Sequence, residues 1–281
     1  MKGDGDVYVL DLDQTIVGNV TYIIFKYNIA MQAETIGLLE DGKAFIRPWL
    51  VDAIKDLIRP HFADFLAHVK KRGARVFIYT SSHRPWATFV VEAVEEIIGL
   101  TFDRPLFTRE NVTLADPLFD PSSVVPQGSK SMALISDAIE KAIGHKLTPE
   151  RVVIVDDNLS VWNSNDVKRF RTIRCPAYRY IAFIDPFDGF YPRILNHPDI
   201  RRSKIKDVDI YNPGGGPAER YQWCITTMAA IAREYTWVKN DEFWLKLRMC
   251  GTKGCDAAST PRTSTRTPTG SRAGPPPPPP R

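Results

Sequence analysis

Two aspartates near the N-terminus, Asp11 and Asp13, are the first residues in this chain whose types and spacing suggest chemistry; they lie in the segment VYVLDLDQT. Residues two apart on an extended strand point to the same side, so the two carboxylates are predicted to lie side by side. Like charges this close repel each other, and a divalent cation or a catalytic role would offset that cost. For this motif alone, an aspartate that only caps a turn is the alternative.

Polar residues also follow two later apolar runs. Thr80 and Ser81 follow the run VFIY in the segment VFIYTSS, and Asp156 and Asp157 end the segment VVIVDD. Between them, Lys130 lies near the start of a predicted helix. An ordinary turn threonine and a surface lysine are the alternative interpretations of Thr80 and Lys130.

The elements that position these residues alternate between strands and helices. Short runs rich in valine, leucine and isoleucine predict buried strands, and amphipathic segments that stop at glycine predict helices. The predicted strands are 6–13, 75–80, 151–157 and 170–175, and the predicted helices are 61–72, 86–98 and a segment from Ser129 to Gly144. This alternation predicts an α/β fold, a Rossmann-like parallel sheet with helices on both faces and a small or absent cap. In such sheets ligands bind beyond the carboxyl ends of the strands, where the polar residues fall.

Three regions are expected along the chain. Residues 1–185 form the catalytic core, and residues 186–255 form a partly helical extension packed on it. Residues 256–281 are rich in Ser, Thr, Arg and Pro and hold no large apolar residue other than proline, so they are predicted to be disordered. The six prolines of this tail favour a polyproline II ligand for an SH3 or WW-type partner, and an inert solubilising tail is the alternative.

Charge and cysteine content exclude several classes of protein. The formal net charge is +4, and residues 256–281 contribute +3 from four arginines and one aspartate, which leaves +1 for the rest. The core therefore gives no strong nucleic-acid signal. Four cysteines without metal-ligand spacing argue against a disulfide scaffold or a zinc site, and no apolar run is long enough to span a membrane. We expect a soluble, intracellular protein with no membrane partner.

The order of the motifs resembles that of the haloacid-dehalogenase superfamily of phosphotransferases: D-x-D, then Thr, then Lys, then an acidic pair. Within that superfamily, residues 6–185 look most like the small C-terminal-domain phosphatases, which dephosphorylate the tail of RNA polymerase II. The resemblance rests on DLDQT, Arg59–Pro60, IYTSS, and VIVDD followed by Trp162. Gln14 departs from it, because the family usually has Glu at that position.

The resemblance implies roles for the polar residues. Asp11 would attack phosphorus and become a phosphoaspartate, and Asp13 would protonate the leaving alcohol and later deprotonate water. Thr80, Ser81 and Lys130 would bind the phosphoryl oxygens.

The resemblance also implies Mg²⁺ as the cofactor. Its ligands would be the Asp11 carboxylate, the Asp13 carbonyl and Asp157. Asp156 would orient Lys130, and it is the competing candidate for the metal ligand.

The function implied is a Mg²⁺-dependent phosphoserine or phosphothreonine protein phosphatase, with a phosphorylated protein such as the polymerase tail as substrate. A polynucleotide 3′-phosphatase or a small-metabolite phosphatase is the alternative, since the same D-x-D-x-T chemistry serves both. A catalytically silent binding scaffold is the second alternative. A nuclear location follows from the resemblance alone.

Overall fold

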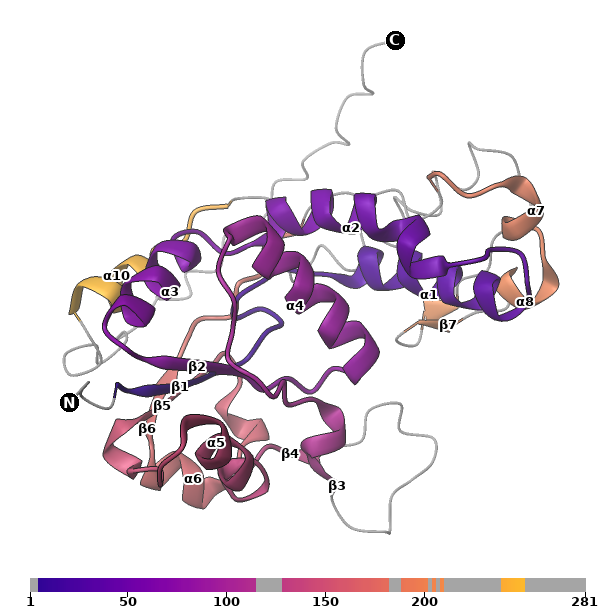
Figure 1. The fold of residues 1–281 in the computed structure, drawn as a ribbon. Coiled ribbons are helices and arrows are strands. Elements are labelled where there is room, and N and C mark those ends of the chain that lie inside the picture. Colours follow the sequence, from indigo (N-terminus) through magenta and orange to yellow (C-terminus); the bar gives the residue numbers. More distant parts are fainter. Residues whose placement is uncertain are drawn as a thin grey trace, which may run out of the picture.

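A four-stranded parallel sheet forms the centre of the fold (Figure 1). The structure is a computed structural model and describes residues 5–114, 128–181, 188–201, 204–205, 208–209 and 239–250. The strands are β1 (Val7–Leu10), β2 (Arg75–Ile78), β5 (Val152–Asp156) and β6 (Arg171–Arg174), in the order β2-β1-β5-β6. Every neighbouring pair is parallel, and Val7 lies opposite both Arg75 and Val152. The predicted α/β fold with a parallel sheet is confirmed.

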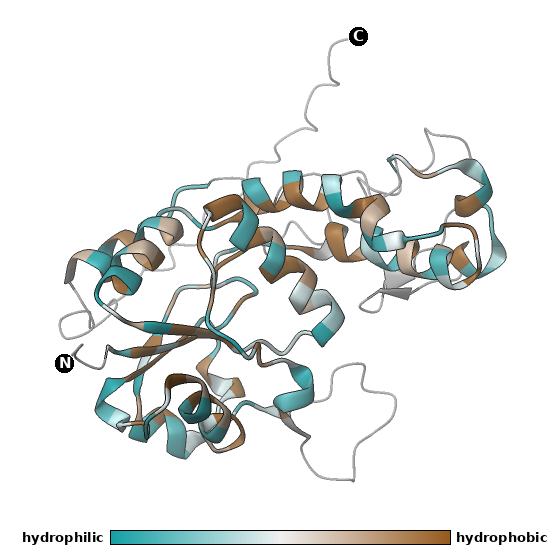
Figure 2. Cartoon of the chain, in the orientation of Figure 1, coloured by the Kyte–Doolittle hydropathy of each residue, from teal (hydrophilic) through white to brown (hydrophobic). Residues whose placement is uncertain are grey.

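Helices cover both faces of this sheet. On one side in Figure 1 lie α1 (Thr21–Thr35), α2 (Gly42–Leu57), α3 (Phe62–Lys71), α4 (Arg84–Ile98) and α10 (Phe243–Cys250). On the other side lie α5 (Ser136–Ile143) and α6 (Ser164–Arg169). The helices are two-coloured in Figure 2, because they carry hydrophobic residues for the core and hydrophilic residues for the solvent.

Alternate residues of the strands enter two separate hydrophobic clusters, one on each face. The cluster beneath α1–α4 and α10 takes Tyr8, Leu10, Val76, Ile78, Val153 and Val155. The cluster beneath α5 and α6 takes Val7, Val9, Phe77, Tyr79, Val152 and Ile154. This period of two, with both faces apolar, explains why the strands are continuous apolar runs in the sequence.

Several short elements complete the described chain. They are the strand pairs β3 (Thr113–Leu114) with β4 (Gly128–Ser129) and β7 (Lys204–Ile205) with β8 (Val208–Asp209), and the one-turn helices α7 (Pro192–Leu195) and α8 (Pro198–Arg201). Single 3₁₀ turns occur at Arg109–Asn111, Met132–Leu134, Pro149–Arg151 and Leu159–Val161. No helix in the described ranges is long and apolar enough to cross a membrane.

The helix pair α1 and α2 was not predicted. It follows the loop after β1 and packs as two contacting helices, with α2 also against α4. The sequence signals were weak, because Val20, which precedes α1, provides no side-chain cap and α2 contains Pro48. The helices α1 and α2 therefore form a small helical insertion in the chain between β1 and β2.

The helix expected from Ser129 onward starts later than predicted. Ser131, rather than Ser129, provides a cap, and it caps the 3₁₀ turn Met132–Leu134. The α-helix proper begins at Ser136 and ends, as predicted, at Gly144, which has a φ of 82°. The tail 256–281, for which disorder is predicted, lies outside the described residues.

Candidate active site

The predicted site residues meet at the carboxyl edge of the sheet. Asp11 follows β1 directly, and its N–H donates to Val155 O at 2.9 Å, which extends the β1–β5 ladder by one residue. Asp156 is the last residue of β5. Thr80 follows β2 by two residues, and its N–H donates to Phe107 O at 3.0 Å. Parallel strands of equal register therefore deliver these side chains to one edge, as expected.

Lys130 is the central cation of this edge. Its Nζ lies 2.6 Å from Asp11 Oδ1 and 2.8 Å from Asp156 Oδ2, and the side chain is buried. The Lys130 main chain is fixed by hydrogen bonds to a neighbouring segment, with its N–H donating to Val161 O at 2.7 Å. Lys130 thus lies between β4 and a 3₁₀ turn rather than inside a helix, and its ammonium joins the ends of β1 and β5.

Burial and charge act against each other in this group. Burial alone would lower the pKa of Lys130, but the carboxylates of Asp11 and Asp156 raise that pKa above its usual range. Burial raises the pKa of Asp11, while Lys130 opposes this shift. A buried charge is tolerated only when it is paired and hydrogen-bonded, so the Lys130 ammonium and the two carboxylates stabilise one another.

Asp13 faces a different set of partners from Asp11. Its Oδ2 accepts a hydrogen bond from Ser82 Oγ at 2.8 Å and lies 3.3 Å from Thr80 Oγ1. Asp11 instead faces Lys130, so the two aspartates do not share one environment, although the strand argument placed their side chains together. The strand ends at Leu10, before either aspartate, and the chain then turns. Gln14, within this turn, has a φ of 60°, a conformation that costs a non-glycine residue energy.

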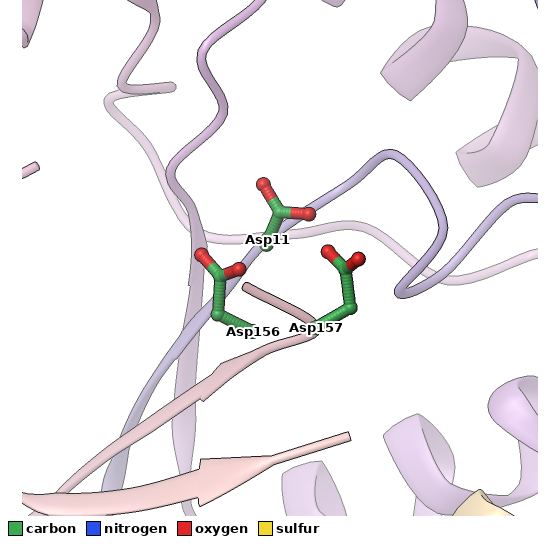
Figure 3. A group of neighbouring side chains, drawn as sticks. All are labelled: Asp11, Asp156 and Asp157. Atoms are coloured by element: carbon green, nitrogen blue, oxygen red, sulfur yellow. The ribbon is translucent and has the colours of Figure 1, made fainter. Parts of the chain in front are cut away.

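Three carboxylates form a group that could hold a metal ion (Figure 3). Oxygens of Asp11, Asp156 and Asp157 lie within 4.8 Å of one another. Figure 3 shows the three side chains converging from the ends of β1 and β5. Hard oxygen donors at this spacing fit Mg²⁺. Burial and then the neighbouring Asp156 raise the pKa of Asp157 to about 6, the effect expected when carboxylates crowd together.

Asp156 has more partners than its neighbour. Besides Lys130, it accepts Trp162 Nε1–H at Oδ2 (2.8 Å) and the N–H of Asn158 at Oδ1 (2.8 Å). The Asp157 N–H donates to Thr15 Oγ1 at 3.2 Å, and the Asp157 carboxylate is one of the three that could hold a metal ion. Asp156 therefore contacts Lys130, while both Asp156 and Asp157 belong to the carboxylate group, so the choice of Asp157 as metal ligand stays a prediction.

Two residues of the site, Ser82 and Trp162, were not assigned a role from the sequence. Ser82, which was not predicted, contacts Asp13, whereas the Ser81 side chain is exposed and its binding of substrate stays a prediction. Trp162 follows the acidic pair in the motif that carries the resemblance, and its indole N–H donates to Asp156 Oδ2. The sequence signal for Ser82 was only its place in the run of polar residues after β2.

A cavity of about 520 Å³ adjoins Asp13. One wall comes from α1 and the other from the start of α4, and its side chains include Ile24, Tyr27, Met31, His83, Trp86 and Arg109. Trp86 is buried, and its indole N–H has no hydrogen-bond partner within the described ranges. Pockets of this size, mostly apolar with a few polar groups, are typical of ligand sites.

The parallel sheet, with Asp11, Lys130 and Asp156 in contact at its carboxyl edge, agrees with the arrangement that the haloacid-dehalogenase resemblance implies. A family model described as NLI interacting factor-like phosphatase matches residues 7–196, which is 190 of the 281 residues (196 − 7 + 1). The chain belongs to the NLI interacting factor-like phosphatase family.

Two solved structures that match the chain have low sequence identity to it. The structure of "Fcp1, an essential RNA polymerase II CTD phosphatase" is 15% identical with a TM-score of 0.42, and the match covers 87% of this chain and 60% of that one. A hydrolase from Pseudomonas syringae is 18% identical with a TM-score of 0.29, covering 53% of this chain and 74% of that one. This chain thus spans about three-fifths of the Fcp1 chain. No curated protein matches.

Proposed function

We propose that the protein is a Mg²⁺-dependent protein serine/threonine phosphatase that acts through a phosphoaspartate on Asp11. The observation that carries the proposal is the position of Lys130, whose Nζ lies within 2.8 Å of both Asp11 and Asp156 at the carboxyl edge of the sheet. A buried ammonium next to a carboxylate nucleophile is suited to an incoming phosphate dianion, whose charge would otherwise repel the carboxylate.

The first step would form a bond between an Asp11 oxygen and phosphorus while the bond from phosphorus to the leaving alcohol oxygen breaks. Asp13, which lies on the side of the cavity, would give its proton to that oxygen. Thr80 Oγ1, 3.3 Å from the Asp13 carboxylate, would donate to a phosphoryl oxygen beside it.

In the second step, water would attack the phosphoaspartate. Asp13, now ionised, would accept a proton from that water, so the acid and the base of the cycle are one residue. The bond from phosphorus to Asp11 would then break, releasing phosphate and restoring the carboxylate. When bound, Mg²⁺ would be held by Asp11 and Asp157, with the Asp13 carbonyl as the third ligand, and would neutralise phosphate charge.

For the substrate we propose a phosphorylated protein of the RNA polymerase II tail type. The support is family membership together with the printed description of Fcp1 as a phosphatase of that tail. The cavity beside Asp13 lies where the leaving group would extend. The same cavity favours a second candidate, a small-metabolite phosphatase, because about 520 Å³ can hold a whole small molecule.

The test is steady-state hydrolysis of p-nitrophenyl phosphate with and without Mg²⁺, beside the variant Asp11→Asn. Metal-dependent turnover that disappears in the variant supports the mechanism. A folded wild-type protein that is inert with Mg²⁺ present contradicts it and favours the scaffold. Phosphopeptides, 3′-phosphorylated oligonucleotides and small phosphate esters are then compared by kcat/KM, and robust turnover of only one of the latter two would overturn the choice of substrate.

A further inference from the structure

A segment from far along the chain packs behind the catalytic loop. Helix α10 contacts α3, and its residue Trp244 is completely buried. The Trp244 ring lies 5.1 Å from the Phe62 ring and 4.6 Å from the Phe65 ring, measured between centroids. Trp244 and Leu247 of the segment 239–250 are therefore part of the core, although they lie beyond the residues that the family model matches.

An ion pair ties the start of this segment to Arg59. The Arg59 guanidinium is completely buried, and its Nε and Nη2 each lie 2.8 Å from one of the two oxygens of Asp241. Two parallel charge-assisted hydrogen bonds of this kind are strong and geometrically specific. Asp241 Oδ1 also accepts the N–H of Phe243 at 3.0 Å, so one carboxylate both begins α10 and holds Arg59.

Arg59 and Trp244 both donate hydrogen bonds to the D-x-D-x-T loop. The carbonyl oxygen of Thr15 lies 3.4 Å from Arg59 Nη1 and 3.3 Å from Trp244 Nε1, each a donor to it. The hydroxyl oxygen of the same threonine accepts the N–H of Asp157 at 3.2 Å. Thr15 therefore connects the distant helix to a metal-site aspartate, and it lies two residues after Asp13.

We propose that Arg59, Asp241 and Trp244 are positioning residues that hold the catalytic loop through the carbonyl of Thr15. The proposal rests on the proposed function for its effect on turnover, but its structural part does not. Without the Asp241 carboxylate, Arg59 is a buried cation that has lost its bidentate partner, so it moves toward water and releases Thr15. Catalysis is sensitive to displacements of about 1 Å, so loosening the loop lowers turnover more than it lowers substrate binding.

The experiment compares three full-length variants. Asp241→Asn keeps an acceptor for the N–H of Phe243 and removes the charge that pairs with Arg59. Trp244→Phe keeps the aromatic packing and removes only the donor to Thr15. Glu242→Gln is the matched control. Glu242 is the next residue in the chain, and its exposed carboxylate pairs with Lys246 instead of Arg59.

Two measurements are made on each protein: kcat and KM for p-nitrophenyl phosphate, and hydrogen–deuterium exchange of the peptide that covers residues 11–20. For Asp241→Asn and Trp244→Phe we expect kcat to fall about 10-fold or more, with KM within about 2-fold of wild type. Exchange in residues 14–18 should be faster, while exchange in β5 stays at the wild-type level. Glu242→Gln should match the wild type in both measurements.

Unchanged loop exchange in folded Asp241→Asn and Trp244→Phe would overturn the proposal, whatever the activity. Faster exchange everywhere in both variants would also overturn it, because the role would then be one of general stability. If Asp241→Asn fails to fold, the proposal is judged on Trp244→Phe alone, because that variant retains the ion pair between Arg59 and Asp241. A wild-type protein without phosphatase activity, combined with selective loop exchange, would contradict the proposed function and leave the positioning role supported.

Discussion

Lys130 and Trp162 donate hydrogen bonds to the same oxygen of Asp156. Lys130 Nζ and Trp162 Nε1 each lie 2.8 Å from Asp156 Oδ2. Their main chains are also paired as an isolated parallel bridge, in which Asn163 N–H donates to Lys130 O at 2.8 Å. Trp162, which orients the Asp156 carboxylate, and Lys130, which pairs with that carboxylate, are therefore also joined through their main chains.

The first prediction concerns Trp162→Phe. The phenyl ring keeps most of the packing but leaves Asp156 without its indole donor, so the carboxylate and Lys130 are less well oriented. We expect kcat to fall about 10-fold to 100-fold with the fold intact. Trp49→Phe on α2 is the matched control, and equal loss of activity in both variants would show that the indole of Trp162 has no special role.

Lys130→Met tests the cation itself. Loss of a preorganised charge at the phosphoryl oxygens should reduce kcat/KM by about 10²-fold to 10³-fold. Breaking the buried contacts to Asp11 and Asp156 should also lower the free energy of unfolding by about 3–5 kcal/mol. Denaturant titration measures the second effect, and Lys141→Met on the exposed face of α5 should show neither.

Asp13→Asn should distinguish leaving groups. An alkyl phosphate needs protonation of its alcohol oxygen, so its turnover should fall by about 10²-fold to 10⁴-fold. p-Nitrophenolate leaves without that proton, so this substrate should give a burst of nitrophenol followed by slow hydrolysis of the phosphoaspartate. Rapid-quench kinetics measures the burst, and an equal loss for both substrates without a burst would contradict the dual role of Asp13.

A pH effect follows from Asp157, whose pKa in the fold is raised to about 6 from its ordinary 3.8 by burial and by Asp156. A raised pKa means that the folded state favours the protonated form. The stability from this group is therefore full below about pH 4 and is lost as the pH rises through about 6.

Because a cation needs the ionised carboxylate, the rise in Tm on adding Mg²⁺ should be larger at about pH 8 than at about pH 5. Thermal unfolding at the two pH values measures this rise. Asp157→Asn should remove most of the difference, and a rise that does not depend on pH in the wild type would contradict the assignment.

Deletion of residues 256–281 should leave kcat and KM for p-nitrophenyl phosphate unchanged, because the predicted catalytic residues all precede that tail. If the tail instead binds an SH3 or WW-type partner, the deletion should abolish binding to such a domain while activity persists. Loss of turnover without loss of folding would show that the tail takes part in catalysis.

Much of the fold was predictable because its strands are local apolar runs. Three apolar runs, together with the segment FRTIRC, were enough to predict the parallel sheet, and the strand ends indicated where Asp11, Thr80 and Asp156 would meet. Helices α1 and α2 were missed, since one lacks a capping residue and the other contains Pro48, so local signals did not reveal helices that tertiary packing stabilises.

The details of the site were less accessible from the sequence. That Ser82 rather than Ser81 binds Asp13 depends on how the chain turns after β2, which strand periodicity does not determine. The pairing of Arg59 with Asp241 joins residues 182 positions apart, and no local pattern encodes such a contact. Lys130 was found only through the resemblance, because an isolated lysine carries no signal of burial.

The place of β1 in the sheet has a consequence for synthesis of the protein. Val7 lies opposite Arg75 on one side and Val152 on the other, so its second neighbour is made 145 residues later (152 − 7). A nascent chain on the ribosome would therefore carry the apolar segment VYVL with one edge unpaired until β5 had emerged. Pairings this distant in sequence form slowly, and an unpaired edge invites aggregation. We expect chaperone capture of β1 during translation.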